Sequence, residues 1–187
     1  MHRRWYFIVA VVLLIDLIGV AIWLRWQRDH RYDDHIRHAA EKYGVDAALV
    51  KAVVWRESRF KPAVRGKAGE IGLMQIRELA ANEWATAEKI PNFHHEHILD
   101  PGSNTLVGAW YLAKMLKRYR QTDDPVPFAL ADYNAGRTKM LDWLEDAAKT
   151  NSAAFLERMD YPGTKDYVTH IMNARERFRR DFPVIAR

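Results

Sequence analysis

The sequence predicts an all-α protein in which one N-terminal transmembrane helix precedes a helical domain. From about residue 36 onward, apolar side chains recur at intervals of three and four, which is the period of an amphipathic helix. Runs that alternate between apolar and polar residues are no longer than about four, so no segment has the pattern of a half-buried strand. The beginning of the chain is instead one long apolar run.

That apolar run covers residues 5–24, WYFIVAVVLLIDLIGVAIWL, and contains one charged residue, Asp16. A helix needs about 20 apolar residues to cross about 30 Å of hydrocarbon, so the run is long enough to span a bilayer. Tryptophan and tyrosine stand at its ends, as at a membrane interface. A cleaved signal peptide has a shorter apolar core, of about 7–15 residues. We therefore expect an uncleaved anchor in residues 1–27, and we interpret Asp16 as a tolerated polar residue rather than a contact with a partner helix.

The charge of the chain is concentrated around this anchor. The 29 Lys and Arg exceed the 24 Asp and Glu by five, but residues 1–28 hold four arginines against one aspartate, and residues 29–187 retain an excess of only two. So small an excess gives little support to a nucleic-acid interface, and we expect no nucleic-acid partner. The chain has no cysteine, which excludes disulfides, cysteine-ligated metal sites, thiol catalysis and a lipid-modified cysteine.

After a charged connector at 28–35, the sequence predicts a helical domain over 36–187. The first helix is expected to end at Gly44, and the next to begin after an Asp46 N-cap and run to about residue 60. A loop rich in Gly and Lys follows at 61–72. Proline and glycine separate the remaining helical patterns. These are expected over 78–89, 104–120, 126–133, 138–149 and 164–180.

The helix predicted over 46–60 carries a carboxylate on its apolar face. Its stripe includes Val53 and Phe60, and Glu57 lies four residues after the first and three before the second. Lys51 and Arg56, with Arg59, are expected on the exposed face. Burial raises the pKa of a glutamate, and a protonated carboxyl is what a general acid requires. A structural ion pair is the alternative explanation of this pattern.

Four motifs follow one another along the domain. They are ESRF at 57–60, GLMQI at 72–76, DYNAG at 132–136 and YPGTKDYV at 161–168. In this order and spacing they resemble the lytic transglycosylases with a soluble-lytic-transglycosylase-type domain, over about residues 36–180. The resemblance implies a lysozyme-like fold, activity on peptidoglycan and no metal or other cofactor.

The resemblance also implies roles for individual residues. Glu57 matches the catalytic acid/base of the family, and Gln75 and Tyr133 match residues that line its sugar-binding cleft. An amide such as that of Gln75 offers both a donor and an acceptor to an acetamido group. The remaining residues expected to bind substrate are Ser58, Met74, Asn134 and Tyr167, although Met74 also suits a core position.

The chain departs from the usual family pattern at several positions. Gly66 stands where the family often has serine, and Arg77-Glu78 where Met-Pro is usual. Asp132 replaces an alanine, and 163–165 read Gly-Thr-Lys instead of Glu-Thr-Arg. None of these positions is the expected acid, but they bear on contacts with the glycan.

The implied reaction is cleavage of the β-1,4 bond between N-acetylmuramic acid and N-acetylglucosamine, with formation of a 1,6-anhydro end. One alternative is a hydrolase similar to goose-type lysozymes, in which further acidic residues deliver water; Glu70 is the nearest candidate, and we interpret it as a solvated loop charge. Another is a non-catalytic wall-binding component of the envelope. A metal site at 94–97 (HHEH) is disfavoured, because adjacent side chains do not converge on one ion.

The expected location follows from substrate and anchor together. Peptidoglycan lies outside the inner membrane, so we expect a single-pass inner-membrane protein whose domain faces the wall. Partners beyond the glycan strands and the membrane, such as an envelope complex, are open at this level.

Overall fold

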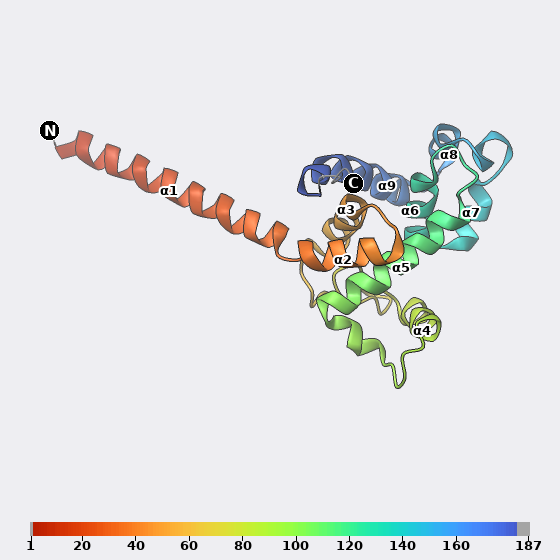
Figure 1. Cartoon of the computed structure of the whole chain (residues 1–187). Coiled ribbons are helices and arrows are strands. Elements are labelled where there is room, and N and C mark those ends of the chain that lie inside the picture. Colours follow the sequence, from red (N-terminus) through yellow and green to blue (C-terminus); the bar gives the residue numbers. More distant parts are fainter. Residues whose placement is uncertain (1, 183–187) are drawn as a thin grey trace, which may run out of the picture. The chain divides into compact units, whose positions relative to one another are not determined.

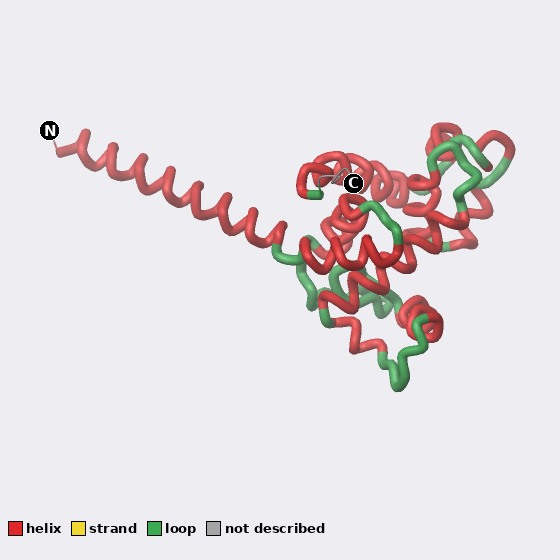
Figure 2. Tube along the Cα trace, viewed as in Figure 1, coloured by secondary structure: helices red, strands yellow, loops and turns green. Residues whose placement is uncertain are grey.

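The computed structural model describes the backbone of residues 2–182 and the side chains of residues 4–182. The last residues of the expected domain, 183–187, lie outside the described part. The chain divides into two compact units, with the boundary between Tyr32 and Asp33. Helices make up most of both, and loops are confined to short connections and one longer segment (Figure 2). Within the described residues there are no strands, only two isolated bridges at Ile71, and the all-α prediction is confirmed.

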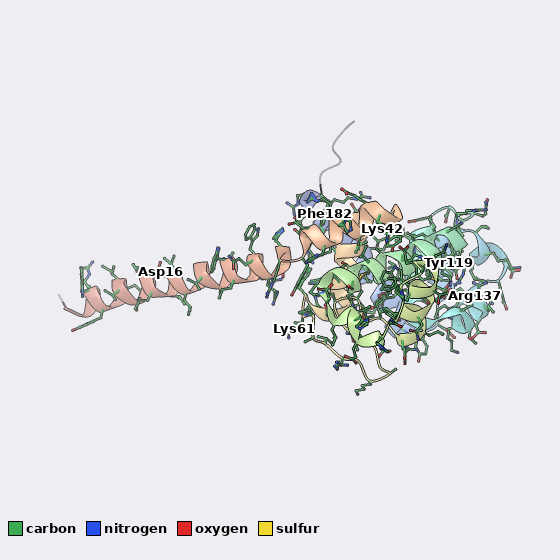
Figure 3. All side chains as sticks on the ribbon, turned by 60° about the horizontal axis from the view of Figure 1, so that its bottom comes forward. Asp16, Lys42, Lys61, Tyr119, Arg137 and Phe182 are labelled. Carbon is green, nitrogen blue, oxygen red and sulfur yellow. The ribbon has the colours of Figure 1, made fainter. Side chains whose placement is uncertain are left out.

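The first unit is essentially one helix, α1 (His2–His30). Its apolar side chains, from Trp5 to Trp26, are exposed along its length. Asp16 stands about midway along it (Figure 3). The helix is long and apolar enough to cross a membrane. An apolar surface of this kind is stable in hydrocarbon rather than in water.

The second unit is a bundle of eight α-helices with three short 3-10 segments among the described residues. The α-helices are α2 (Asp33–Tyr43), α3 (Ala47–Ser58), α4 (Glu78–Ala87), α5 (Pro101–Arg118), α6 (Pro125–Ala135), α7 (Arg137–Trp143), α8 (Ser152–Arg158) and α9 (Pro162–Phe178), and the 3-10 segments are η1 (His95–Leu99), η2 (Asp146–Lys149) and η3 (Arg179–Asp181). α3 packs against α9 and α2, and α5 packs against α2 and α6 (Figure 1).

Beyond shifts of up to three residues at helix ends, the structure differs from the predicted elements in three places. The helix expected over 138–149 is two elements, α7 and η2, because the backbone leaves helical geometry at Leu144. α8 was not expected from the sequence; its Asn151 caps it by accepting from the Ala154 amide at 2.8 Å. The connector expected at 28–35 is helical except at Arg31 and Tyr32.

Both ends of α3 are fixed by local backbone interactions. Asp46 is its N-cap, as predicted, and accepts from the Ala48 amide at 2.9 Å. At the other end Arg59 and Phe60 take left-handed backbone conformations, with φ of 52° and 61°. Non-glycine residues adopt these values at an energetic cost, and two in succession end the helix sharply. Glu57 consequently stands in the last turn of α3.

Lys51 corrects one expectation about this helix. The sequence places it on the exposed face, but its side chain is 0% exposed. Its ammonium donates to Asp33 at 2.9 Å and to Asp181 at 2.7 Å, which satisfies the buried charge. These carboxylates come from the first residue of α2 and the last of η3, so Lys51 connects the two ends of the described domain.

Asn104 of α5 organises the long loop between α3 and α4. Its side chain is fully buried and makes three hydrogen bonds: it accepts from the Met74 amide at 2.8 Å and donates to the carbonyls of Ile71 at 3.0 Å and Ile98 at 2.8 Å. The amide reaches the loop because Gly72 has no side chain, and a Cβ there would lie 2.0 Å from Nδ2 of Asn104. Gly72 also has φ of +83°, which favours glycine.

Replacing Asn104 by alanine is expected to lower the free energy of unfolding by about 3–5 kcal/mol, because the buried Met74 amide and Ile98 carbonyl would lose the Asn104 side chain as partner. The Ile71 carbonyl would keep its hydrogen bond from the Ile76 amide. Thermal unfolding of the detergent-solubilised chain measures the effect. Asn82→Ala, at an exposed position of α4, is the matched control and should change stability by no more than about 0.5 kcal/mol. Equal stability of the two variants would contradict the role given to Asn104.

Candidate functional site

A cavity of about 280 Å³ lies where α3, the 70–77 loop, α5 and α6 meet. Its wall includes both candidate carboxyl groups and several aromatic and amide side chains. Of the residues predicted from sequence, Glu57, Gln75, Tyr133 and Asn134 line it, together with Glu70, Arg77, Tyr111, Asp132 and Gly136. The structure thus brings residues from three of the four sequence motifs to one cavity.

Glu57 is the carboxyl group in this cavity whose pKa is moved to near neutrality. Burial raises the pKa of Glu57 to about 7, and the charge of Glu70 contributes in the same direction. A hydrogen bond of 2.6 Å from the Tyr167 hydroxyl to Oε1, and the charge of Arg56, lower the pKa but do not offset burial. Near neutral pH both protonation states of Glu57 are therefore populated, as proton donation and acceptance at one group require.

Two tyrosines near Glu57, the buried Tyr167 and the half-buried Tyr133, are neutral donors. Burial and the charge of Glu57 raise the pKa of both Tyr133 and Tyr167 well above the ordinary value. Tyr167, from α9, donates to Glu57, whereas Tyr133 donates to the carbonyl of Met74 at 2.8 Å. Tyr133 also contacts Tyr111 edge to face, with ring centroids 5.5 Å apart. Tyr111, which the sequence motifs did not identify, extends this aromatic wall of the cavity.

Gln75 has a different hydrogen-bonding role from the one expected. It lies in a left-handed conformation, with φ of 49°, and its Nε2 donates to the carbonyls of Val64 at 3.0 Å and Gly72 at 2.9 Å. Both amide hydrogens thus serve the loop. The group Gln75 can offer to a ligand is its carbonyl oxygen, an acceptor only.

Ser58 and Met74 are not among the described residues that line the cavity. The Ser58 hydroxyl donates to the Val54 carbonyl of its own helix at 3.1 Å. Met74 is fully buried, and a Cβ at Gly108 would lie 2.1 Å from its sulfur. Both side chains pack within the domain in this structure, and their contact with a ligand stays a prediction.

Asn134 and Tyr167 connect the cavity to neighbouring helices through side-chain hydrogen bonds. Asn134 lines the cavity, and its Oδ1 accepts from the Thr164 hydroxyl at 2.8 Å, which joins α6 to the start of α9. Tyr167 reaches the cavity only through its hydrogen bond to Glu57. These two residues hold the site together across three helices.

Glu70 is not the solvated loop charge that we inferred from the sequence. Its side chain is 19% exposed, lines the cavity and pairs with Arg77, whose Nε lies 2.9 Å from Oε1. The sequence did not reveal this pair, because Arg77 and Glu70 stand on opposite sides of the GLMQI motif. The departure from Met-Pro at Arg77 was the available indication.

Asp132 forms a second network at the cavity wall. It is 2% exposed and accepts from Arg118 and from the Tyr119 hydroxyl, the latter at 2.8 Å. Arg137 donates to the same hydroxyl at 2.9 Å, and Figure 3 shows Tyr119 and Arg137 at the same end of the domain. Asp132 is thus a paired, buried carboxylate that fixes α6 against α5, rather than a second acid facing a ligand.

The histidines at 94–97 serve the loop that carries the site. His95 contacts the Ile76 carbonyl at 3.0 Å, and Glu96 pairs with Arg65 through two hydrogen bonds. His94 and His97 form a reciprocal cap at the start of η1. These interactions give the segment a structural role: it supports the loop that carries Ile76.

Comparison with known proteins places this geometry in a family. Residues 34–156 match the family model described as the transglycosylase SLT domain. The chain is 33% identical over 109 residues to membrane-bound lytic murein transglycosylase F of Desulfosudis oleivorans, covering 57% of this chain and 22% of that protein. It is 28% identical over 143 residues to the soluble lytic murein transglycosylase of Escherichia coli K12, covering 75% and 22% of the two chains.

The crystal structure of the 70-kDa soluble lytic transglycosylase of Escherichia coli has the same fold, with a TM-score of 0.72 and 25% identity over 81% of this chain and 24% of that chain. The lysozyme-like fold expected from the motifs is confirmed. The chain spans about a quarter of the length of these relatives. The family match ends before α9, so Tyr167 lies outside it.

The raised pKa of Glu57 predicts a pH-dependent stability. Unfolded glutamate releases its proton near pH 4.5 and the folded group near 7, so the folded state binds more protons in between and loses stability as pH rises through this window. Glu57→Gln removes the effect. The stability of the variant relative to wild type should increase by up to about 3 kcal/mol between pH 4.5 and pH 7.5.

Unfolding of both proteins at a series of pH values measures this difference. Glu41→Gln, at an exposed position of α2, provides the control and should track wild type at every pH. A stability difference between Glu57→Gln and wild type that does not vary with pH would show that Glu57 has an ordinary pKa.

Proposed function

Because the chain belongs to the transglycosylase SLT domain family, we propose that it is a peptidoglycan lytic transglycosylase with Glu57 as its single acid/base. The substrate is the glycan strand, and the bond cleaved is the β-1,4 linkage between N-acetylmuramic acid and N-acetylglucosamine. The observation that carries this proposal is a carboxyl group in a cavity, with a pKa of about 7 and a tyrosine hydroxyl 2.6 Å away.

The reaction proceeds in two proton transfers at the same group. Protonated Glu57 donates its proton to the bridging oxygen as the bond to C1 of the muramyl residue breaks. The resulting carboxylate then takes the proton of the muramyl 6-hydroxyl while O6 attacks C1. The products are a free 4-hydroxyl on N-acetylglucosamine and a 1,6-anhydro muramyl end, and Glu57 is protonated again. The substrate supplies the nucleophile, so the second carboxylate that most glycosidases use as nucleophile or base is not required.

The other cavity residues have supporting roles in this proposal. Tyr167 holds the Glu57 carboxyl in one orientation through their hydrogen bond. The carbonyl oxygen of Gln75 accepts from the N–H of an acetamido group, because both hydrogens of its own amide are engaged. Tyr111 and Tyr133 present an aromatic wall to the sugar rings. Asn134 borders the same space.

A hydrolase is the second candidate, because Glu70 lines the same cavity. In that reaction a second carboxylate activates water, and the product has a reducing end instead of an anhydro ring. The family names favour the transglycosylase. Mass analysis of the released muropeptides separates the two, since the anhydro product lacks one water.

We propose that α1 anchors the protein in the inner membrane with the domain on the wall side. The length, composition and exposed apolar side chains of α1 support a membrane span, and several relatives carry membrane-bound in their names. The proposed organisation is an anchor over 1–27, a connector over 28–35 and a catalytic domain over 36–187. α2 begins at Asp33, which favours a start a few residues earlier. An envelope complex stays a candidate partner.

Glu57→Gln should abolish the activity while preserving the fold. Glutamine keeps the shape and the hydrogen bond to Tyr167 but cannot cycle a proton, so turnover should fall by about 10²–10⁴-fold or more. Digestion of purified sacculi, followed by mass analysis of the products, measures this, and binding to sacculi should persist. Glu41→Gln is the matched control with wild-type turnover. Near wild-type turnover in a folded Glu57→Gln variant would rule out the assignment.

The orientation of the anchor is tested in spheroplasts. Protease added outside the inner membrane should digest the domain and leave a cytoplasmic marker protein intact. Protection of the domain would show the opposite orientation. A mature protein that lacks the first residues and is released from the membrane would show a cleaved signal sequence instead.

A further inference from the structure

The cavity holds a second carboxylate whose surroundings differ from those of Glu57. Oε1 of Glu70 accepts from Nε of Arg77 at 2.9 Å, and Nη2 of Arg77 lies 2.8 Å from the same oxygen. Oε2 accepts from the Ala68 amide at 3.0 Å. Both oxygens are therefore held in place, and the group has one orientation at the cavity wall.

These contacts favour the ionised form. Burial by itself raises the pKa of Glu70, but backbone amides and Arg77 together lower it below the ordinary value. Glu57 and Glu70 are thus two carboxyl groups in one cavity whose pKa values move apart, one upward and one downward. Such a division is typical of sites in which one carboxyl transfers a proton and the other stays charged.

Two substitutions relative to the family pattern make room for this anion. A Cβ at Gly66, where the family often has serine, would lie 2.3 Å from Oε2 of Glu70. Arg77, which replaces a residue of the usual Met-Pro, supplies the countercharge. Gly66, Glu70 and Arg77 therefore lie together in the structure. Glycine at position 66 leaves space for the Glu70 carboxylate, and arginine at position 77 pairs with it.

We propose that Glu70 is a second catalytic carboxylate: a fixed anion that stabilises the positive charge developing on the muramyl ring while Glu57 transfers the proton. The inference rests on the proposed function. Cleavage of a glycosidic bond passes through an oxocarbenium-like state, and a preoriented negative charge lowers its energy. In this proposal Glu70 forms no bond to carbon and stays ionised, because the Ala68 amide and Arg77 stabilise its charged form.

Glu70 also influences the acid itself. The titratable and charged groups facing Glu57 are Tyr167 from α9, Tyr133 from α6, Arg56 on its own helix, and Glu70 from the loop. Of these, Glu70 adds a negative charge that keeps the proton on Glu57. Neutralising Glu70 should therefore lower the pKa of Glu57.

The decisive variant is Glu70→Gln in the full-length protein, compared with Glu96→Gln. Glu96 also pairs with an arginine of the same loop, Arg65, but does not line the cavity. Glu70→Gln should lower kcat by roughly 10- to 100-fold, with KM nearly unchanged, and should move the basic limb of the pH–rate profile to lower pH. Glu96→Gln should match wild type in all three, and the products of every variant should stay 1,6-anhydro.

Gly66→Ala tests the steric part of the proposal. The added methyl group would displace the Glu70 carboxylate, so turnover should fall, and the double variant Gly66→Ala/Glu70→Gln should be no slower than Glu70→Gln alone. A further loss in the double variant would show that Gly66 does not act through Glu70.

Three results would overturn the proposal. The first is a Glu70→Gln variant with the kcat and pH profile of wild type. The second is an equal loss of kcat in Glu96→Gln. The third is a wild-type product with reducing ends that disappears in Glu70→Gln, because Glu70 would then act as a base toward water. Failure of the proposed function would give a different result, namely near wild-type turnover in Glu57→Gln.

Discussion

The site depends on one buried amide. The side chain of Asn104 binds the backbone at Ile71, Met74 and Ile98, and so attaches the loop that carries the cavity residues Glu70 and Gln75 to α5. A loop that runs through the interior must satisfy its backbone groups there, and one asparagine provides a donor pair and an acceptor at once. The left-handed turn at Gln75 and the carbonyl that receives Tyr133 both follow from it. The chemistry at α3 therefore depends on a residue of α5 that does not reach the cavity.

The electrostatics of the site arise from unequal burial within a small space. Glu57 stands in the last turn of a helix packed on two sides, so it loses hydration and gains one phenolic donor. Glu70 lies on a loop, where the Ala68 amide and the Arg77 guanidinium donate hydrogen bonds to it and stabilise its negative charge. The same residue type thus acquires opposite pKa shifts from different burial and different hydrogen-bond partners. The raised pKa of Glu57 lowers the free energy of unfolding at neutral pH.

The features that could be predicted from the sequence are those that depend on neighbouring residues. The helices follow from periodicity, the start of α3 from the Asp46 cap, and the inward position of Glu57 from its place on the apolar stripe. The prediction was wrong about Lys51, whose burial requires carboxylates far away in sequence, at positions 33 and 181. Glu70 likewise could not be predicted, because its burial depends on Gly66 and Arg77 meeting it in space. The motifs also assigned Ser58 and Met74 to substrate binding, and the structure places both side chains outside the cavity lining, because neighbouring positions in a motif need not face the same side.

The attachment of both domain ends to Lys51 bears on modularity. The first residue of α2 and the last residue of η3 bind the same ammonium, so the two ends of the described domain lie next to each other. Units whose ends meet can be joined to other segments, or inserted within them, without disturbing their interior. The relatives of this chain are about four times longer than the part that it matches. A closed pair of ends, remote in sequence from the cavity residues, gives a physical reason why a unit with this fold is compatible with longer chains.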